Sequence, residues 1–227
     1  MKIRHFAALG IPLLGLIPVS AQALPAEIIL LRHGEKADKY RLSKTGEERA
    51  RALAAVYLGK DASHSLLPKG SKPAAVMTVT LHTIETATPT SLSWGIPETA
   101  YTAVPEWQQT EAQKKAQETA RTQAAAYALL HDPKYDGKVV LVFWEHARIA
   151  SAKLEKHFPG QQVTFRQLLH LDKLSGVPQT WPKHTFDYFW ILKYQGNNPV
   201  PAQFQMQKQV YTGKYANLPQ NAWGQPE

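Results

Sequence analysis

The sequence predicts one α/β domain, a three-layer α/β/α sandwich with a mostly parallel central sheet. Three apolar, strand-like runs, at residues 27–31, 74–81 and 139–144, alternate with segments of helical character. This alternation is typical of parallel sheets whose crossover helices cover both faces. A chain of 227 residues without an internal repeat suits one well-packed domain.

Residues 1–23 have the pattern of a secretory signal peptide. Lys2 and Arg4 precede an apolar stretch over residues 6–19, and the small residues around position 23 fit a cleavage site. Two glycines and two prolines make that stretch a poor permanent membrane helix, and no later segment has the length and hydropathy of a span. We therefore expect a single mature domain over residues 24–227, located in a bacterial periplasm or secreted.

Several helices are expected in the segments between the strands. A capping box predicts a helix from Thr45, with Gly59 as its stop. A second capping box begins an alanine-rich helix over residues 110–130. Further helices are expected at residues 83–94 and 147–158.

The C-terminal third predicts two late strands. Residues 186–194 and 203–211 are rich in aromatic and β-branched side chains, and a Gly-Asn-Asn-Pro turn at residues 196–199 separates them. An antiparallel pair is therefore expected. The Pro-, Asn- and Gln-rich tail from Asn217 fits either a surface wrap or disorder.

Composition excludes several function classes. The chain has no cysteine, so neither disulfides nor thiolate chemistry is available. The formal net charge of +8 favours anionic ligands. The basic residues are scattered, without an arginine-rich arm or aromatic-basic alternation, so we expect no nucleic acid partner.

Each of the three apolar runs leads into a histidine. The first ends on Arg32-His33-Gly34-Glu35, the second on His82 and the third on Glu145-His146. In open α/β sheets, ligands bind beyond the carboxyl ends of the strands. The three imidazoles are therefore expected to converge on one pocket.

These residue types suit phosphoryl transfer. A nitrogen of His33 can attack phosphorus and carry the phosphoryl group covalently. The guanidinium of Arg32 can clamp phosphate oxygens, and Gly34 would allow a close backbone approach to the ligand. His146 would be a second donor that neutralises charge on the transferring group.

The segment Leu31–Lys36 resembles the signature of the histidine phosphatase superfamily, the phosphoglycerate-mutase-like proteins. The resemblance extends in order over residues 27–158. Its other stretches are Leu42–Gly46, Arg49-Ala50, Leu53-Ala54, Glu85–Ala87 and Val140–His146.

The resemblance implies a phosphoglycerate-mutase-like fold and a phosphoric monoester hydrolase that needs no cofactor and no metal. His33 would be the phosphorylated nucleophile, with His146 as the second catalytic histidine. The expected phosphate-binding residues are Arg32, Glu35, Lys36 and His82. Export favours hydrolysis over mutase activity, with a small-molecule or envelope phosphate ester, such as one of lipopolysaccharide, as substrate.

Two positions depart from the family pattern or leave it open. His82 stands where the family usually has a second arginine, and Lys36, Arg41 or Arg148 could supply the missing cation. For the general acid, we rank Glu106 first, followed by Glu145 and Glu35. Glu145 is disfavoured because adjacent residues in a strand point to opposite faces.

Two other functions are compatible with the same residues. A non-catalytic periplasmic binder of phosphorylated ligands is motivated by the substitution at His82. A zinc hydrolase could use His33, His82 and His146 as ligands, because three histidines and a water form a common catalytic zinc site. Arg32 opposes the zinc alternative, since its charge would repel a dication.

Overall fold

The computed structural model describes residues 23–103 and 108–225. Within them, its strands are β1 (Glu27–Arg32), β2 (Ala75–Thr78), β3 (Thr99–Ala100), β4 (Val139–Trp144), β5 (Tyr188–Lys193) and β6 (Gln203–Lys208). Its α-helices are α1 (Lys44–Leu53), α2 (Leu81–Trp94), α3 (Glu111–His131), α4 (His146–Ile149), α5 (Ala152–His157) and α6 (Phe165–Leu168).

The six strands form one sheet in the order β3-β2-β4-β1-β5-β6. β1 to β4 run parallel, while β5 pairs antiparallel with β1 and β6 antiparallel with β5. The predicted mostly parallel sheet and the predicted antiparallel late pair are both confirmed. Arg32 at the end of β1 lies opposite Trp144 at the end of β4. The residues that follow these two neighbouring strands therefore leave the sheet side by side.

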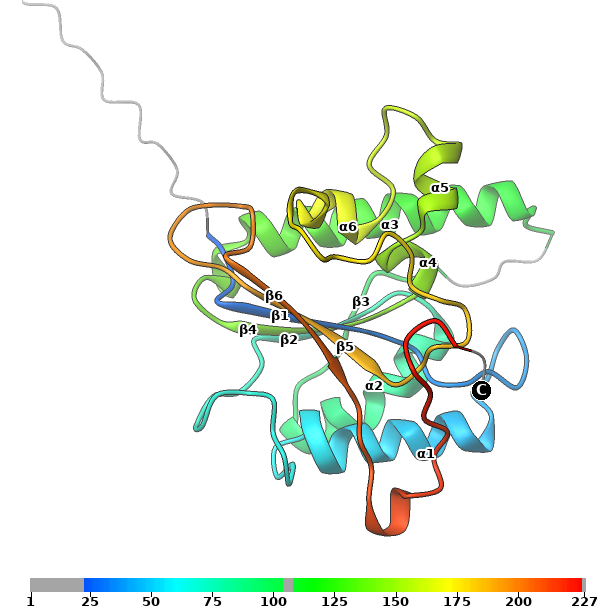
Figure 1. Cartoon of the computed structure of the whole chain (residues 1–227), viewed down its shortest axis with the longest axis vertical. Coiled ribbons are helices and arrows are strands. Elements are labelled where there is room, and N and C mark those ends of the chain that lie inside the picture. Colours follow the sequence, from blue (N-terminus) through cyan, green and yellow to red (C-terminus); the bar gives the residue numbers. More distant parts are fainter. Residues whose placement is uncertain (1–22, 104–107, 226–227) are drawn as a thin grey trace, which may run out of the picture.

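Helices cover both faces of the sheet, as predicted. In Figure 1, α1 and α2 lie on one face, and α3, α5 and α6 lie on the other. Side chains of the central strand β1 pack on both faces of the sheet. Ile28 and Leu30 belong to one hydrophobic core, and Ile29 and Leu31 belong to the other. A strand buried on both faces explains the continuous apolar run in the sequence.

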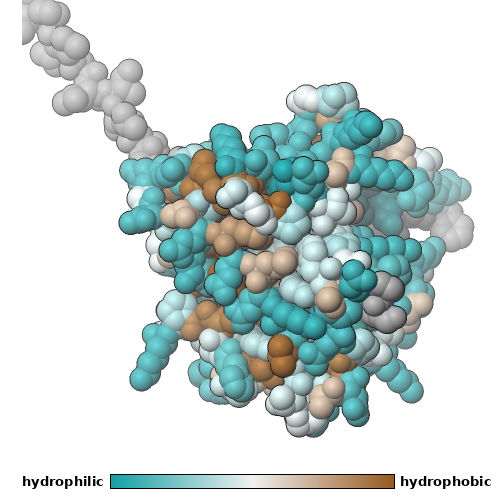
Figure 2. Space-filling view, in the orientation of Figure 1, coloured by the Kyte–Doolittle hydropathy of each residue, from teal (hydrophilic) through white to brown (hydrophobic). Residues whose placement is uncertain are grey.

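The outer surface is mostly polar on the face shown in Figure 2, with small apolar areas between hydrophilic residues. Among the described residues, no helix has the length and hydropathy needed to cross a bilayer.

Two helix starts differ from the prediction. The hydroxyl of Ser43, and not that of Thr45, caps α1 by accepting a hydrogen bond from the amide of Gly46. The second apolar run ends earlier than expected, because Thr80 caps α2. His82 therefore lies in the first turn of a helix and not at the end of a strand.

The helix expected at residues 147–158 is interrupted. It consists of α4 and α5, which are separated by extended backbone at Ala150 and Ser151. The carbonyl oxygen of Ala150 accepts a hydrogen bond from the amide of Trp181, and Ser151 caps α5. A tertiary contact thus takes the place of continued helical hydrogen bonding.

The remaining helix predictions agree with the structure. α3 begins at the predicted capping box of Thr110 with Gln113, and α2 spans the helix predicted at residues 83–94. Gly59 ends the first helical segment, which closes with a π-helical turn over Ala54–Leu58. The tail wraps the surface, and its Leu218 is buried in the hydrophobic core that contains Ile29 and Leu31.

Candidate active site

Three histidines gather at the carboxyl edge of the sheet, as the sequence predicts. His33 follows β1, His146 opens α4 after β4, and His82 lies in the first turn of α2. The ring centroid of His33 is 5.7 Å from that of His82 and 6.4 Å from that of His146. His33 is therefore the centre of the cluster.

The local hydrogen bonds of His33 select one tautomer. Its Nδ1 lies 2.6 Å from the carbonyl oxygen of Gly34, which can only accept, so Nδ1 carries the hydrogen. Burial, with a smaller contribution from Arg32 and Lys36, lowers the pKa of His33 to about 4. At neutral pH the ring is neutral, and the lone pair on Nε2 is available for nucleophilic attack.

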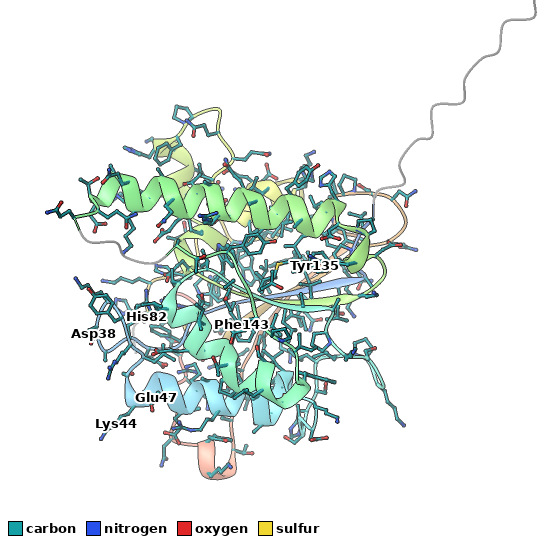
Figure 3. The ribbon with its side chains drawn as sticks, turned by 180° about the vertical axis from the view of Figure 1, so that it is seen from behind. Asp38, Lys44, Glu47, His82, Tyr135 and Phe143 are labelled. Carbon is teal, nitrogen blue, oxygen red and sulfur yellow. The ribbon has the colours of Figure 1, made fainter. Side chains whose placement is uncertain are left out.

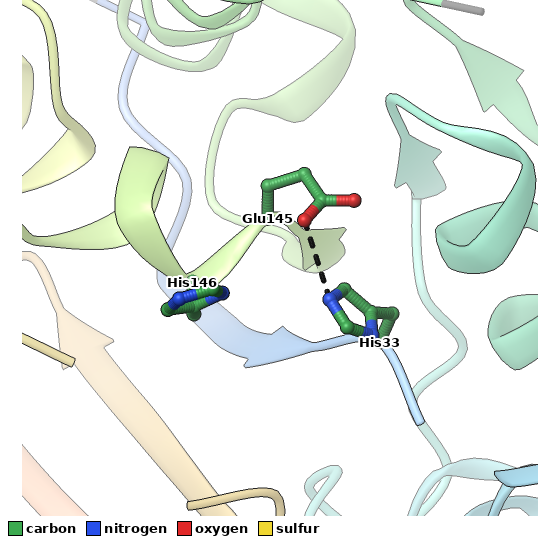
Figure 4. Close-up of side chains that lie close together, drawn as sticks. All are labelled: His33, Glu145 and His146. Atoms are coloured by element: carbon green, nitrogen blue, oxygen red, sulfur yellow. Dashed lines mark ion pairs between the residues drawn. The ribbon is translucent and has the colours of Figure 1, made fainter. Parts of the chain in front are cut away.

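Glu145 contacts the Nε2 atom of His33 directly. Its Oε2 is 3.2 Å from His33 Nε2, the pair joined by a dashed line in Figure 4. Its Oε1 accepts a hydrogen bond of 2.8 Å from the Thr80 hydroxyl. Lys36 Nζ lies 3.1 Å from the same Oε1. Burial opposes the ionisation of Glu145, but the charge that His33 carries when protonated and the charge of Lys36 outweigh it and hold the pKa of Glu145 well below the usual range.

Glu145 faces His33, which corrects the prediction that it points away from the site. β4 ends at Trp144 and α4 begins at His146, so Glu145 occupies the junction between them. Strand alternation no longer applies there, and Glu145 and His146 both lie beside His33. The sequence signal that could have shown this is the polar pair immediately after a fully apolar strand, which marks the end of the strand.

Arg32 lies beside His33 and contacts the loop before β5. Its Nη2 is 3.5 Å from His33 Nε2, and its Nη1 donates to the carbonyl oxygen of Lys183 at 2.6 Å. The ring of Phe186 lies 3.8 Å from the guanidinium carbon. The guanidinium is nearly fully buried and is oriented by protein contacts before any ligand binds.

His146 offers a further polar group to the cluster. Burial, followed by the charge of Arg32, lowers its pKa to about 3. Its Nδ1 is buried and has no hydrogen-bond partner among the residues that the structure describes. Since buried polar atoms normally have partners, this nitrogen is a candidate ligand contact.

His82 does not replace the family's second arginine as a cation. Its Nε2 lies 2.8 Å from the carbonyl oxygen of Asp38, which accepts the hydrogen bond, and Figure 3 shows the two residues on neighbouring segments. Burial and then the charge of Lys36 lower the pKa of His82, so the ring is neutral at neutral pH.

Lys36 is the alternative cation whose side chain reaches the cluster, through Glu145. Arg148 is turned towards α3, where it pairs with Glu118 and donates to Thr119. Arg41 lies on the exposed loop before α1. The spacing of the sequence could not choose among these three cations, and the structure favours Lys36.

The role expected of Glu35 in phosphate binding stays a prediction, and its carboxylate is paired within the protein. Both of its carboxylate oxygens accept hydrogen bonds from the buried guanidinium of Arg49. Gly34 has a packing role that the sequence did not predict. Its amide donates to the Thr86 hydroxyl, and a Cβ on Gly34 would lie 2.9 Å from the carbonyl oxygen of Gly46. The glycine permits close packing against α1 and does not present its amide to a ligand.

A cavity of about 90 Å³ opens beside the cluster. Its charged lining residues are Lys36, Lys39, Lys114, Glu118 and Glu145, and His82 also lines it. Glu106, the first-ranked general acid, lies in the segment 104–107, outside the described residues, so its role stays a prediction.

The structure also brings together a set of possible metal ligands. Ligand atoms of His33, Glu145 and His146 lie within 4.8 Å of one another. The zinc hypothesis used His82 in place of Glu145, so its ligand set differs. Arg32 beside His33 and Lys36 on Glu145 both disfavour a dication in this place.

The neutral, buried histidines predict that the fold loses stability in acid. In the unfolded chain His33 and His146 titrate near 6.5, and in the folded protein near 4 and 3. Between these values the unfolded chain binds more protons, so the free energy of unfolding falls as the pH decreases below about 6.5. We expect each histidine to contribute a loss of about 2 to 3 kcal/mol between pH 7 and pH 4.5.

Urea unfolding of the wild type and of His33→Asn and His146→Asn at both pH values would measure this loss. The variants are expected to lose less stability between the two pH values than the wild type. His131→Ala, at an exposed position at the end of α3, should keep the wild-type pH dependence. Equal pH dependence in all four proteins would contradict the prediction.

No protein-family model matches this sequence, and no curated protein matches it. Among solved structures, the chain is similar to an Agrobacterium tumefaciens protein with a provisional assignment as the phosphohistidine phosphatase SixA. Identity is 17% and the TM-score is 0.39, over 82% of this chain and 97% of that chain.

It is also similar to Mycobacterial hydrolase 2, at 18% identity and a TM-score of 0.38 over 82% of this chain and 90% of that one. For Mycobacterial hydrolase 1, the identity is 17% and the TM-score is 0.37, over 83% of this chain and 98% of that chain. Likenesses at this level carry no functional argument, so the function has to be argued from the site.

Proposed function

We propose that this protein is an exported phosphatase that hydrolyses phosphate monoesters through a phosphohistidine intermediate on His33. The observation that carries the proposal is the state of His33, a buried neutral imidazole. Its Nε2 faces the guanidinium of Arg32 on one side and the carboxylate of Glu145 on the other. A nucleophile, a fixed cation and a candidate proton donor thus meet at one nitrogen atom.

In the first step, His33 Nε2 attacks phosphorus and the ester P–O bond breaks. The leaving oxygen takes a proton from Glu145, and the phosphoryl group stays on Nε2. Arg32, Lys36 and His146 surround the position of the phosphoryl oxygens and stabilise their charge. The hydrogen bond from Nδ1 to Gly34 holds the ring in place during the attack.

In the second step, a water molecule attacks phosphorus and the P–N bond breaks. The electron pair of that bond returns to Nε2, and the carboxylate of Glu145 accepts the proton of the water. Inorganic phosphate then leaves as the monoanion with the proton held by Glu145, and the site returns to its starting state. Glu145 therefore acts as acid in the first step and as base in the second.

The proton for the first step enters with the substrate. In the free protein Glu145 is ionised at neutral pH and His33 is neutral, so no proton lies between Oε2 and Nε2. A phosphate monoester dianion would meet the carboxylate with like charge, whereas the monoanion supplies a proton to it. We therefore propose the monoanion as the reacting form, which favours activity between about pH 4 and about pH 6, the second pKa of a phosphate monoester.

Export and the substrate class are part of the same proposal. The basic and apolar pattern of residues 1–23 supports cleavage and transfer to the periplasm or the medium. In that compartment, small-molecule phosphate esters and phosphates of the cell envelope are the available substrates. The lysines around the cavity favour esters whose leaving group is polar or anionic.

A screen of the mature protein, residues 24–227, against a panel of phosphate esters tests the proposal. The panel contains aryl, sugar and glycerol phosphates and purified lipopolysaccharide, and free phosphate is measured at pH 5.5. We expect release from at least one ester, inhibition by vanadate, and an acid-labile, alkali-stable phosphate label on the quenched protein.

The same screen distinguishes the two alternatives. Phosphate-ester binding without release and without a label would favour the non-catalytic binder and would contradict the phosphatase. Loss of activity on treatment with a chelator, restored by zinc, would favour the metal hydrolase. Neither vanadate inhibition nor a phosphohistidine label is expected of a site that works through zinc-bound hydroxide.

A further inference from the structure

One irregular loop before β5, which we call the arginine loop (Pro182–Phe186), holds Arg32. Nη1 of Arg32 donates to the carbonyl oxygens of Pro182 at 3.3 Å, Lys183 at 2.6 Å and Thr185 at 3.3 Å. The Phe186 ring lies against the guanidinium carbon at 3.8 Å. The position of the cation beside the nucleophile therefore depends on the conformation of this loop.

The C-terminal segment 217–225, which we call the strap, binds the arginine loop. Asn221 Nδ2 donates to the carbonyl oxygen of His184 at 3.2 Å, and the amide of Gly224 donates to the Thr185 hydroxyl at 3.3 Å. Two hydrogen bonds thus connect the strap to the middle of the loop. In Figure 1 the red C-terminal segment lies at the same edge of the sheet as the loop that follows β1.

An aromatic cluster anchors the strap to the hydrophobic core that contains Ile28 and Leu30. The ring of Trp223 packs on those of Trp181, Tyr188 and Trp190, with centroid distances of 5.2, 5.1 and 6.1 Å. Nε1 of Trp181 donates to the carbonyl oxygen of Thr185, one of the three carbonyls that bind Arg32. Trp223 therefore supports the arginine loop through Trp181.

The other end of the strap reaches the backbone beside His33. Leu218 is buried in the hydrophobic core that contains Ile29 and Leu31. The carbonyl oxygen of Pro219 accepts a hydrogen bond of 2.9 Å from Arg49. Arg49 is the partner of Glu35, two residues after His33. The strap thus crosses the edge of the sheet from one hydrophobic core to the other and contacts the supports of both Arg32 and His33.

We infer that the strap positions Arg32 for phosphate binding, with Asn221 and Trp223 as positioning residues that act through the arginine loop. The inference rests on the proposed function. Residues of the loop have no strand or helix hydrogen bonding of their own, so their order depends on such external contacts. A guanidinium already oriented in the free protein loses less entropy when an anion binds than one that has to be ordered.

The inference is tested with three variants, Asn221→Ala, Trp223→Phe and Trp223→Ala. Asn217→Ala is the control. Asn217 belongs to the strap, but its side chain is exposed. The affinity for vanadate is measured by calorimetry, and kcat and KM are measured with p-nitrophenyl phosphate. We expect Asn221→Ala and Trp223→Ala to weaken vanadate binding and to raise KM by about tenfold, because the loop hydrogen bonds or their support are lost. Trp223→Phe should have a smaller effect, and Asn217→Ala none.

A double-mutant cycle with Arg32→Lys separates positioning from general destabilisation. Lysine cannot bind the three loop carbonyls with a planar fork, so the strap variants should have little further effect on vanadate affinity in that background. An equal loss in both backgrounds would overturn the inference. So would unchanged affinity in a folded Asn221→Ala or Trp223→Ala protein, with folding checked by thermal unfolding. If the wild type and the strap variants bind vanadate equally well, only the role of the strap is refuted. If the wild type neither binds vanadate nor releases phosphate, the proposed function is refuted as well.

Discussion

Replacement of His33 by alanine is expected to lower phosphate release from every ester by at least about 10⁴-fold. The phosphoryl group would have no nitrogen to bind, and the acid-labile label would disappear with it. Arg32, Lys36 and His146 would remain, so phosphate and vanadate should still bind. Phosphate release is measured at pH 5.5, and the label is measured after an acid-free quench.

Two further variants make the His33 result specific. His131→Ala removes a histidine from the exposed end of α3 and should keep full activity. Added imidazole should restore part of the activity of His33→Ala, because it can enter the space left by the side chain. Phosphate release by His33→Ala at the wild-type rate would rule out the phosphohistidine mechanism.

The second large effect is expected for Glu145→Gln. Loss of the proton donor should slow hydrolysis of alkyl phosphates by about 10²- to 10⁴-fold. p-Nitrophenyl phosphate should be much less affected, because its leaving group departs without a proton. The variant also lacks the carboxylate that repels a dianion, so the decline of kcat/KM above about pH 6 should move to higher pH.

Glu118→Gln is the matched control for Glu145→Gln. Both carboxylates line the cavity, but Glu118 is paired with Arg148 on the side of α3. Its replacement should leave the dependence on the leaving group unchanged. If Glu106 is the proton donor instead, Glu106→Gln and not Glu145→Gln will show the selective loss with alkyl esters.

Much of the fold follows from local patterns in the sequence. The continuous apolar runs of β1 and β4 indicate strands buried on both faces, and the Thr110–Gln113 capping box marks the start of α3. These signals depend on residues a few positions apart, so they survive in any tertiary context. The split between α4 and α5 was missed because it depends on Ala150 binding Trp181, thirty-one positions later.

In the candidate site, too, the sequence predicts some features and not others. The sequence alone places Arg32, His33 and His146 at strand ends, because the end of an apolar run can be read directly. The partners of the side chains cannot be read in this way. The pairing of Glu35 with Arg49 and the contact of Glu145 with His33 depend on how α1 and the β4–α4 junction pack.

Local residue patterns are enough to predict the α/β class, a mostly parallel central sheet and the gathering of three histidines at one edge of the sheet. The physical reason is that hydrophobic periodicity and chain direction are local properties, and parallel strands necessarily present their carboxyl ends together. Which groups surround His33 depends on tertiary packing. Burial and contacts between distant segments, such as those of Arg32 with the arginine loop and of that loop with the strap, set the protonation and orientation of the site.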